Sequence, residues 1–212
     1  MENKLLLKIW NKIVMKRKII FSLIAFIFIA MLVYTKVYTG RVIDAGTKEP
    51  IKGAVVVASW IEERADIAGP TSKSKNVKET LTNKNGRWMI WGPRGMEMGT
   101  ITSIFTFLTF TYITNPPEFI VFKPGYCSWP EGFMIKACKM KPSGVGNGGI
   151  IELLKLTDRE DRLRNSSLWP SLMDSDNESL KKIKNLLKLL DQEDRNLGLS
   201  GDPRLKELEN EK

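Results

Sequence analysis

The period of hydrophobic and polar positions changes twice along the chain. Residues 19–35 form an uncharged apolar run, IIFSLIAFIFIAMLVYT. From residue 39 onward, short β-branched and aromatic runs alternate with turn residues, as strands do. From residue 157 onward, leucines recur at the three- and four-residue spacing of amphipathic helices. The pattern predicts a mainly β body at 39–156, C-terminal helices at 157–198 and a charged tail at 199–212.

The apolar run at 19–35 is expected to be a transmembrane helix. Its 17 residues span about 25 Å as a helix, and Tyr34, Val37 and Tyr38 can extend it into the interface. Residues 1–18 carry six Lys or Arg against one Glu. Because cations collect on the cytoplasmic side, we expect a single-pass signal-anchor in a bacterial inner membrane. The basic lead is then cytoplasmic, and the C-terminal domain is periplasmic.

Three other interpretations of the N-terminal region stay open. A cleaved signal peptide needs small residues at its cleavage site, whereas threonines stand at 35 and 39. A buried core helix would show a polar stripe, which the run at 19–35 lacks. The lead at 1–18 intersperses leucines with lysines, so it is either an amphipathic helix on the anionic leaflet or a plain basic extension.

Turn residues divide the β body into short elements. Asn83-Lys-Asn-Gly86 is a strong hairpin signal because Asn and Gly tolerate positive φ. The β-branched run at 54–60 fits a strand buried on both faces. Residues 61–76 are polar and predict a surface loop. Further strands are expected at 40–43, 77–82, 87–91 and 119–122.

Three motifs then carry a family resemblance. They are Gly40-x-Val42-x-Asp44, Pro50-Ile51-x-Gly53-Ala54-x-Val56 and Thr82-x-x-x-Gly86-Arg87-Trp88-x-Ile90, followed by Phe119-Ile-Val-Phe-Lys-Pro-Gly-Tyr126. In this order they resemble the carboxypeptidase regulatory-like domain, in its bacterial membrane-anchored type. The resemblance implies a transthyretin-like β-sandwich over 39–126, extending toward 156. It also implies a non-catalytic companion module, so no active-site residue carries over.

An insertion at 92–118 departs from that family pattern. Residues 101–114 read ITSIFTFLTFTYIT, an uncharged run of threonines and aromatics. One interpretation is an exposed apolar lip that touches the bilayer or a partner. The other is an additional buried strand or hairpin, because both residue classes favour sheets.

The net charge of +9 does not indicate a nucleic-acid-binding protein. Residues 1–18 contribute +5, residues 36–149 contribute +6 and residues 150–212 contribute −2. The densest positive block therefore flanks the apolar run, where a membrane explains it better than a phosphate backbone does. The chain has no histidine, which excludes histidine-based catalysis and most histidine-ligated metals.

Other motifs give weak chemical signals. Gly144-Val-Gly-Asn-Gly-Gly149 matches a dinucleotide fingerprint literally, but no βαβ unit surrounds it, so a hairpin loop is expected. Carboxylates at Glu62, Glu63 and Asp66, and at 158–161, fit a solvated ion-pair face better than a metal or acid/base site. Cys127 and Cys138 either form a disulfide in an oxidising periplasm or stay as buried thiols.

The C-terminal region shows two helix-capping signals, Thr157-x-x-Glu160 and Ser175-x-x-Glu178, and Gly198 suits a helix end. The second helix carries an apolar stripe formed by Leu180, Ile183, Leu187 and Leu190. This stripe packs either on the β-sandwich or against a partner protein.

These observations predict a non-catalytic interaction module without cofactor or metal. Its expected contacts are the bilayer, through residues 19–35, and an envelope protein. The alternatives are a carbohydrate- or envelope-polymer-binding module and a regulatory partner of an exported hydrolase. Sugars stack on aromatic rings, and the available tryptophans, which core packing can equally explain, are Trp60, Trp88, Trp91 and Trp129.

Overall fold

The structure is a computed structural model in which the chain forms two compact units. The first comprises residues 1–36 with 93–96, and the second comprises residues 37–92 with 97–212. The structure describes residues 10, 14–24, 26, 35–64, 71–94, 113–130, 135, 136, 138, 145–167, 177–201 and 204–206.

The first unit contains a helix over residues 14–24. Its large apolar side chains are exposed, Phe21 at 71%. Within the described ranges, no helix reaches the length and hydrophobicity needed to cross a bilayer. Residues 25 and 27–34 of the predicted membrane segment lie outside the described residues.

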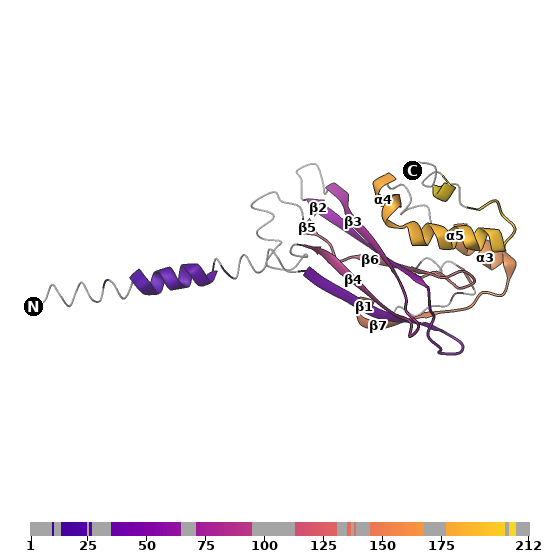
Figure 1. The fold of residues 1–212 in the computed structure, drawn as a ribbon, viewed down its shortest axis with the longest axis horizontal. Helices are drawn as coiled ribbons and strands as arrows, with labels where there is room; N and C mark the ends of the chain where they lie inside the picture. Colours follow the sequence, from indigo (N-terminus) through magenta and orange to yellow (C-terminus); the bar gives the residue numbers. More distant parts are fainter. Residues whose placement is uncertain are drawn as a thin grey trace, which may run out of the picture. The chain divides into compact units, whose positions relative to one another are not determined.

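The second unit is mainly β, as predicted, with helices near its C-terminal end (Figure 1). One sheet has the order β4-β1-β7, and the other has the order β3-β2-β5 with β6 also paired to β2. The strands are β1 (Thr35–Asp44), β2 (Val55–Arg64), β3 (Thr71–Leu81), β4 (Arg87–Arg94), β5 (Ile113–Thr114), β6 (Glu118–Phe122) and β7 (Asn147–Leu153). The helices are α3 (Arg159–Ser167), α4 (Asn177–Lys182) and α5 (Lys184–Asn196).

The two sheets share one hydrophobic core. Strand β2 supplies Val56, Ala58 and Trp60 to it. The opposite sheet supplies side chains from β1, β4 and β7, among them Trp88 and Ile151. Because alternate residues of a strand face opposite sides, the other side of β2 turns Val55 and Val57 away from this core, as predicted for a strand buried on both faces.

Helices α4 and α5 cover that second side of β2 and the adjoining face of β3 and β6 (Figure 1). The predicted apolar stripe therefore packs on the sheet and is not open to a partner. All its members, Leu180, Ile183, Leu187 and Leu190, are buried. The physical reason is that Val55, Val57 and Phe122 on the sheet offer matching apolar area.

Glu79 of β3 fixes the start of α5. Its carboxylate accepts hydrogen bonds from the backbone N–H groups of Asn185 (2.7 Å) and Leu186 (3.0 Å). Ile183, at the N-cap position, makes no capping side-chain bond. Burial raises the pKa of Glu79 above its ordinary value of 4.5. The cap that α5 lacks locally is thus supplied by a strand more than a hundred residues away.

Strand β1 begins earlier than the sequence indicated. It includes Thr35 to Tyr38, and Tyr38 is 3% exposed within the inter-sheet core. The extension of the membrane segment to Val37 and Tyr38 is therefore wrong. Strand pairing and the aromatic contacts of Tyr38 with Trp60 and Phe119 hold this stretch on the sheet.

Two predicted loops are partly strands. Residues 61–64 and 71–76, predicted to lie in a surface loop, extend β2 and β3, and Arg64 pairs with Thr71. Residues 147–149 of the glycine-rich run open β7, which pairs in parallel with β1. Backbone hydrogen bonds alone extend these polar or glycine-rich strands, so hydrophobic pattern does not reveal them.

The ends of the helices also differ from the prediction. Asp158 rather than Thr157 caps α3, because its Oδ1 accepts hydrogen bonds from the backbone N–H groups of Glu160 and Asp161. Gly198 follows α5 with φ of +80°, as a helix-ending glycine does. The tail predicted to be charged at 199–212 contains Leu205, which is 8% exposed in the helix–sheet core.

Candidate functional site

Most of the exposed large hydrophobic side chains described in the second unit gather on the outward face of the sheet β4-β1-β7 and at its border with β3. The helices cover the other sheet, and residues of β4 alternate between the core (Trp88, Ile90) and this outward face. We give the name outer-face patch to six exposed or half-exposed side chains, which come from β1, β4, β7 and the end of β3: Arg41, Leu81, Arg87, Met89, Trp91 and Ile150.

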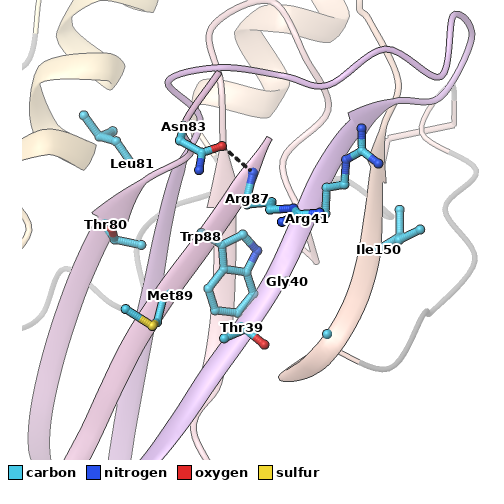
Figure 2. A pocket seen from close by; sticks show the side chains of 11 residues that line it. Thr39, Gly40, Arg41, Thr80, Leu81, Asn83, Arg87, Trp88, Met89 and Ile150 are labelled. Atoms are coloured by element: carbon cyan, nitrogen blue, oxygen red, sulfur yellow. Dashed lines mark hydrogen bonds between the residues drawn. The ribbon is translucent and has the colours of Figure 1, made fainter. Parts of the chain in front are cut away.

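A groove of about 730 Å³ lies within this patch. Its lining comes from all three strands of the sheet and from the end of β3. Figure 2 shows Thr80 and Met89 on one side of it, Ile150 on the other and Arg41 between them. Arg41 and Ile150 are paired neighbours in the β1–β7 register. The groove therefore places a cation directly beside an exposed apolar side chain.

Gly40 allows Trp88 to pack closely against β1 beneath the groove. A Cβ at this position would lie 2.6 Å from Cζ2 of Trp88, far inside van der Waals contact. The missing side chain lets the indole of Trp88 lie against β1, as Figure 2 shows. Trp88 thereby stays 4% exposed and supports the strand that carries Arg87 and Met89.

The hairpin turn between β3 and β4 holds the two arginines in place. Asn83 Oδ1 accepts hydrogen bonds from the backbone N–H of Asn85 (2.9 Å) and of Arg87 (3.1 Å). The Arg41 side chain donates from Nε to the carbonyl oxygen of Asn85 at 3.1 Å. Gly86 completes the turn with φ of +71°. One rigid turn thus positions cations from two strands.

The predicted tryptophan contacts divide into buried and exposed groups. Trp60 and Trp88 lie in the core, and Trp129 packs partly buried against it, so a row of sugar-stacking rings from these residues is not what the structure displays. Trp91 is 54% exposed and belongs to the outer-face patch. The large indole rings of Trp60 and Trp88 fill the space between the two sheets.

Cys127 and Cys138 are joined by a disulfide, with their Cα atoms 5.9 Å apart. Ile135 and Leu156 pack with them in a small separate cluster. Next to this bridge, Asn165 of α3 accepts from the backbone N–H and the hydroxyl of Ser128, both at 2.8 Å. The buried Asn165 side chain thus ties α3 to the segment that carries Cys127.

Asp44 and Tyr126 form a second polar cluster, at the end of β1. The Asp44 carboxylate accepts from the backbone N–H groups of Gly46 (2.8 Å) and Thr47 (2.9 Å) and from the Tyr126 hydroxyl (3.1 Å). The hydrogen bond from Thr47 is the main cause that lowers the pKa of Asp44. Burial, with the Asp44 carboxylate, raises the pKa of Tyr126. An ionised carboxylate that accepts three hydrogen bonds is a weak base and is poorly suited to proton transfer. The same hydrogen bonds stabilise the turn that follows β1.

The described members of the predicted acidic groups lie on separate elements, Glu62 and Glu63 on β2 and Glu160 on α3. Glu160 pairs with Arg164 at 2.6 Å on the exposed side of α3, and Asp158 caps that helix. Asp66 lies outside the described residues. Among the described side chains, no group of three Asp, Glu or Cys residues is arranged to hold a metal ion.

Comparisons with known proteins add little. The sequence matches no family profile and no curated protein. Among solved structures, 3-chlorocatechol 1,2-dioxygenase from Rhodococcus opacus 1CP aligns with a TM-score of 0.28 and 17% identity. The alignment covers 58% of this chain and 60% of the dioxygenase chain. Similarity at that level carries no inference about fold or activity.

Of the residues in the outer-face patch, the sequence pointed to Trp91 alone as a candidate ligand contact. The alternation in Arg87-Trp88-Met89-Ile90-Trp91 was a usable signal, because it separates two faces of one strand. It did not say which face meets solvent, since both contain a tryptophan. Arg41 and Ile150 were harder to find, as they become neighbours only through the parallel pairing of β1 with β7.

Proposed function

We propose that this chain is a non-catalytic interaction module, anchored in a bacterial inner membrane and presented to the periplasm. The outer-face patch is the observation that carries the proposal. Soluble domains rarely expose contiguous apolar surface unless a partner covers it. Here aromatic and aliphatic side chains lie together on a sheet face that none of the described helices covers, with Trp91 at 54% and Met89 at 53% exposure.

Features of the first unit support the membrane anchor. Six cations precede an apolar run that contains no charge. In the helix over 14–24, Ile19, Ile20, Phe21, Leu23 and Ile24 all project into open surroundings. Hydrocarbon would solvate such side chains, whereas water would not. The disulfide of the second unit fits an oxidising compartment on the far side of the membrane.

Turn geometry and layering support the proposed relationship to the carboxypeptidase regulatory-like domain and its transthyretin-like sandwich. Gly53 and Gly86, which carry the resemblance, both adopt positive φ at strand connections. Two sheets with a shared core agree with that architecture. If the chain is related to that family, it is a companion module. Regulation of an exported hydrolase is then one form that its interaction could take.

Carbohydrate binding is the second candidate function, because Trp91 exposes an indole face on which a sugar ring can stack. Protein binding is favoured over it by the company that Trp91 keeps. Leu81, Met89 and Ile150 are aliphatic and match apolar side chains better than sugar hydroxyls. Arginine, tryptophan and methionine together are the residues enriched in protein interfaces.

Site-specific photocrosslinking in intact cells tests the proposal. A photoreactive phenylalanine analogue at Met89 is expected to give a defined protein adduct in the membrane fraction. The same analogue at Lys155, an exposed residue outside the patch, serves as control and should give none. A reporter fused after residue 45 should be active only when exported. Absence of adducts at Met89, or a reporter active only in the cytoplasm, would overturn the proposal.

A further inference from the structure

We propose that the outer-face patch binds an acidic, apolar segment of a partner protein. The segment is an extended stretch in which two or more carboxylates alternate with large apolar side chains. This inference rests on the proposed function and specifies the chemistry of the partner. The patch offers two properties that such a segment matches. It concentrates apolar surface, and it carries two arginines with no carboxylate among the described residues that line the groove.

The apolar surface is concentrated and not scattered. Among the described residues of the second unit, six large hydrophobic side chains are exposed, and four of them belong to the patch: Leu81, Met89, Trp91 and Ile150. They come from three strands, so the surface exists only because the sheets assemble. Single exposed apolar residues are ordinary, whereas a cluster on one uncovered face indicates a contact surface.

The cations of the patch have no acidic counterpart in the groove. Arg41 and Arg87 line it, and none of the described residues that line it is Asp or Glu. The carboxylate of Glu152, which follows Ile150 on the same face of β7, is occupied by Lys48 at 2.6 Å. Two guanidinium groups beside apolar side chains therefore favour carboxylates on the incoming ligand.

The geometry also prepares the arginines for binding. The Nε of Arg41 donates to the carbonyl of Asn85 at 3.1 Å, and this hydrogen bond orients the guanidinium group. The turn at Asn83 fixes the backbone of Arg87. Preorganised donors lose less conformational entropy on binding, and the planar guanidinium fork suits carboxylate oxygens. A groove of about 730 Å³ accommodates several side chains.

Fluorescence anisotropy on the full-length chain in neutral detergent micelles tests the inference. The first probe is a labelled twelve-residue peptide that alternates Glu with Leu and Phe. The second is the same peptide with Gln in place of every Glu. We expect the acidic peptide to bind at least about tenfold more tightly. Its affinity should fall as salt rises from about 50 to about 300 mM, because ions screen exposed charge pairs. Micelles without protein supply the blank.

Matched substitutions locate the binding site. Arg87→Gln and Met89→Ser should each weaken binding of the acidic peptide about tenfold. Lys181→Gln and Leu199→Ser remove a cation and an exposed leucine outside the patch and should leave the affinity unchanged. Unchanged circular dichroism and melting temperature in all four variants exclude unfolding as the cause.

Several outcomes would overturn the inference. Equal binding of the Glu and Gln peptides removes the role of the arginines. Tighter, Arg87-dependent binding of a soluble polyuronate or of phosphatidylglycerol vesicles points to a glycan or a membrane, and Met89-dependent self-association points to a second copy of this chain. If the peptides fail while Met89 still gives protein adducts in cells, only the acidic specificity falls. If those adducts are absent, the proposed function itself falls.

Discussion

Removing Arg162 from α3 should destabilise the protein far more than removing its neighbour Arg164. Arg162 donates to Glu193 of α5 from Nε at 2.8 Å and from Nη2 at 2.7 Å, and these hydrogen bonds raise the pKa of Arg162. Glu193 is 1% exposed. Arg162→Gln therefore leaves a buried carboxylate without its cation, which typically costs about 3–5 kcal/mol.

Arg164 provides the matched comparison on the same helix. It pairs with Glu160 at 2.6 Å, but the two side chains are 66% and 72% exposed. Water screens such a pair and replaces it easily, so Arg164→Gln should cost no more than about 0.5 kcal/mol. Burial, and not the length of the ion pair, is what separates the two cases.

Urea unfolding followed by tryptophan fluorescence measures the difference. At a denaturant dependence of about 2 kcal/mol per molar, Arg162→Gln should lower the midpoint by about 2 M. The double variant Arg162→Met/Glu193→Leu should recover most of that loss, because apolar replacement removes the stranded charge. Equal losses for Arg162→Gln and Arg164→Gln, or no recovery in the double variant, would refute the reasoning.

Three further predictions concern other parts of the second unit. Replacing Cys127 and Cys138 by alanine should cost about 2–3 kcal/mol by releasing a closed loop, and alkylation with and without reductant should change the electrophoretic mobility of the wild type. Gly40→Ala should cost about 1–3 kcal/mol, since its Cβ meets Trp88 at 2.6 Å, with an altered near-ultraviolet circular dichroism. Because burial raises the folded-state pKa of Glu79 above 4.5, wild-type stability should fall relative to Glu79→Gln as pH rises from about that value through the raised pKa.

The Gly40→Ala prediction has a control on the same strand, and the other two predictions each have a contradicting outcome. Thr39→Ala changes the neighbour of Gly40 on the outward face and should leave the near-ultraviolet spectrum intact. Identical mobility with and without reductant would contradict the disulfide. A flat pH difference between wild type and Glu79→Gln would contradict the buried cap.

Local sequence signals identified several elements well. The β-branched run at 54–60 indicated a strand buried on both faces because Ser59 is the one polar residue in it, and the structure buries both sides. Asn83 and Gly86 indicated the hairpin turn because few other residues accept its backbone angles. The leucine stripe indicated an amphipathic helix because its spacing matches the helical period.

Long-range pairing could not be read in the same way. Residues 147–149 looked like a loop because glycine lacks strand propensity, yet they pair in parallel with β1. Residues 61–64 and 71–76 carry no hydrophobic pattern, and they become strands by pairing with each other and, at Glu62 and Glu63, with β5. Asp158 rather than Thr157 caps α3, since neighbouring cap residues compete within a small energy difference.

By itself, the sequence determined the mainly β class, the turns, the amphipathic character of the last helix and the apolar, lysine-led N-terminal segment. These properties depend on neighbours within a few residues, where side-chain size, backbone freedom and periodicity act directly. The tertiary structure decided which face of each element is covered. The helices take the β2-β3-β6 face because apolar area there matches their leucines, and β4-β1-β7 is left with Arg41, Arg87, Met89 and Trp91 toward the outside. Which face of an element is buried depends on all the apolar surfaces of the folded chain, so the sequence of one segment does not determine it.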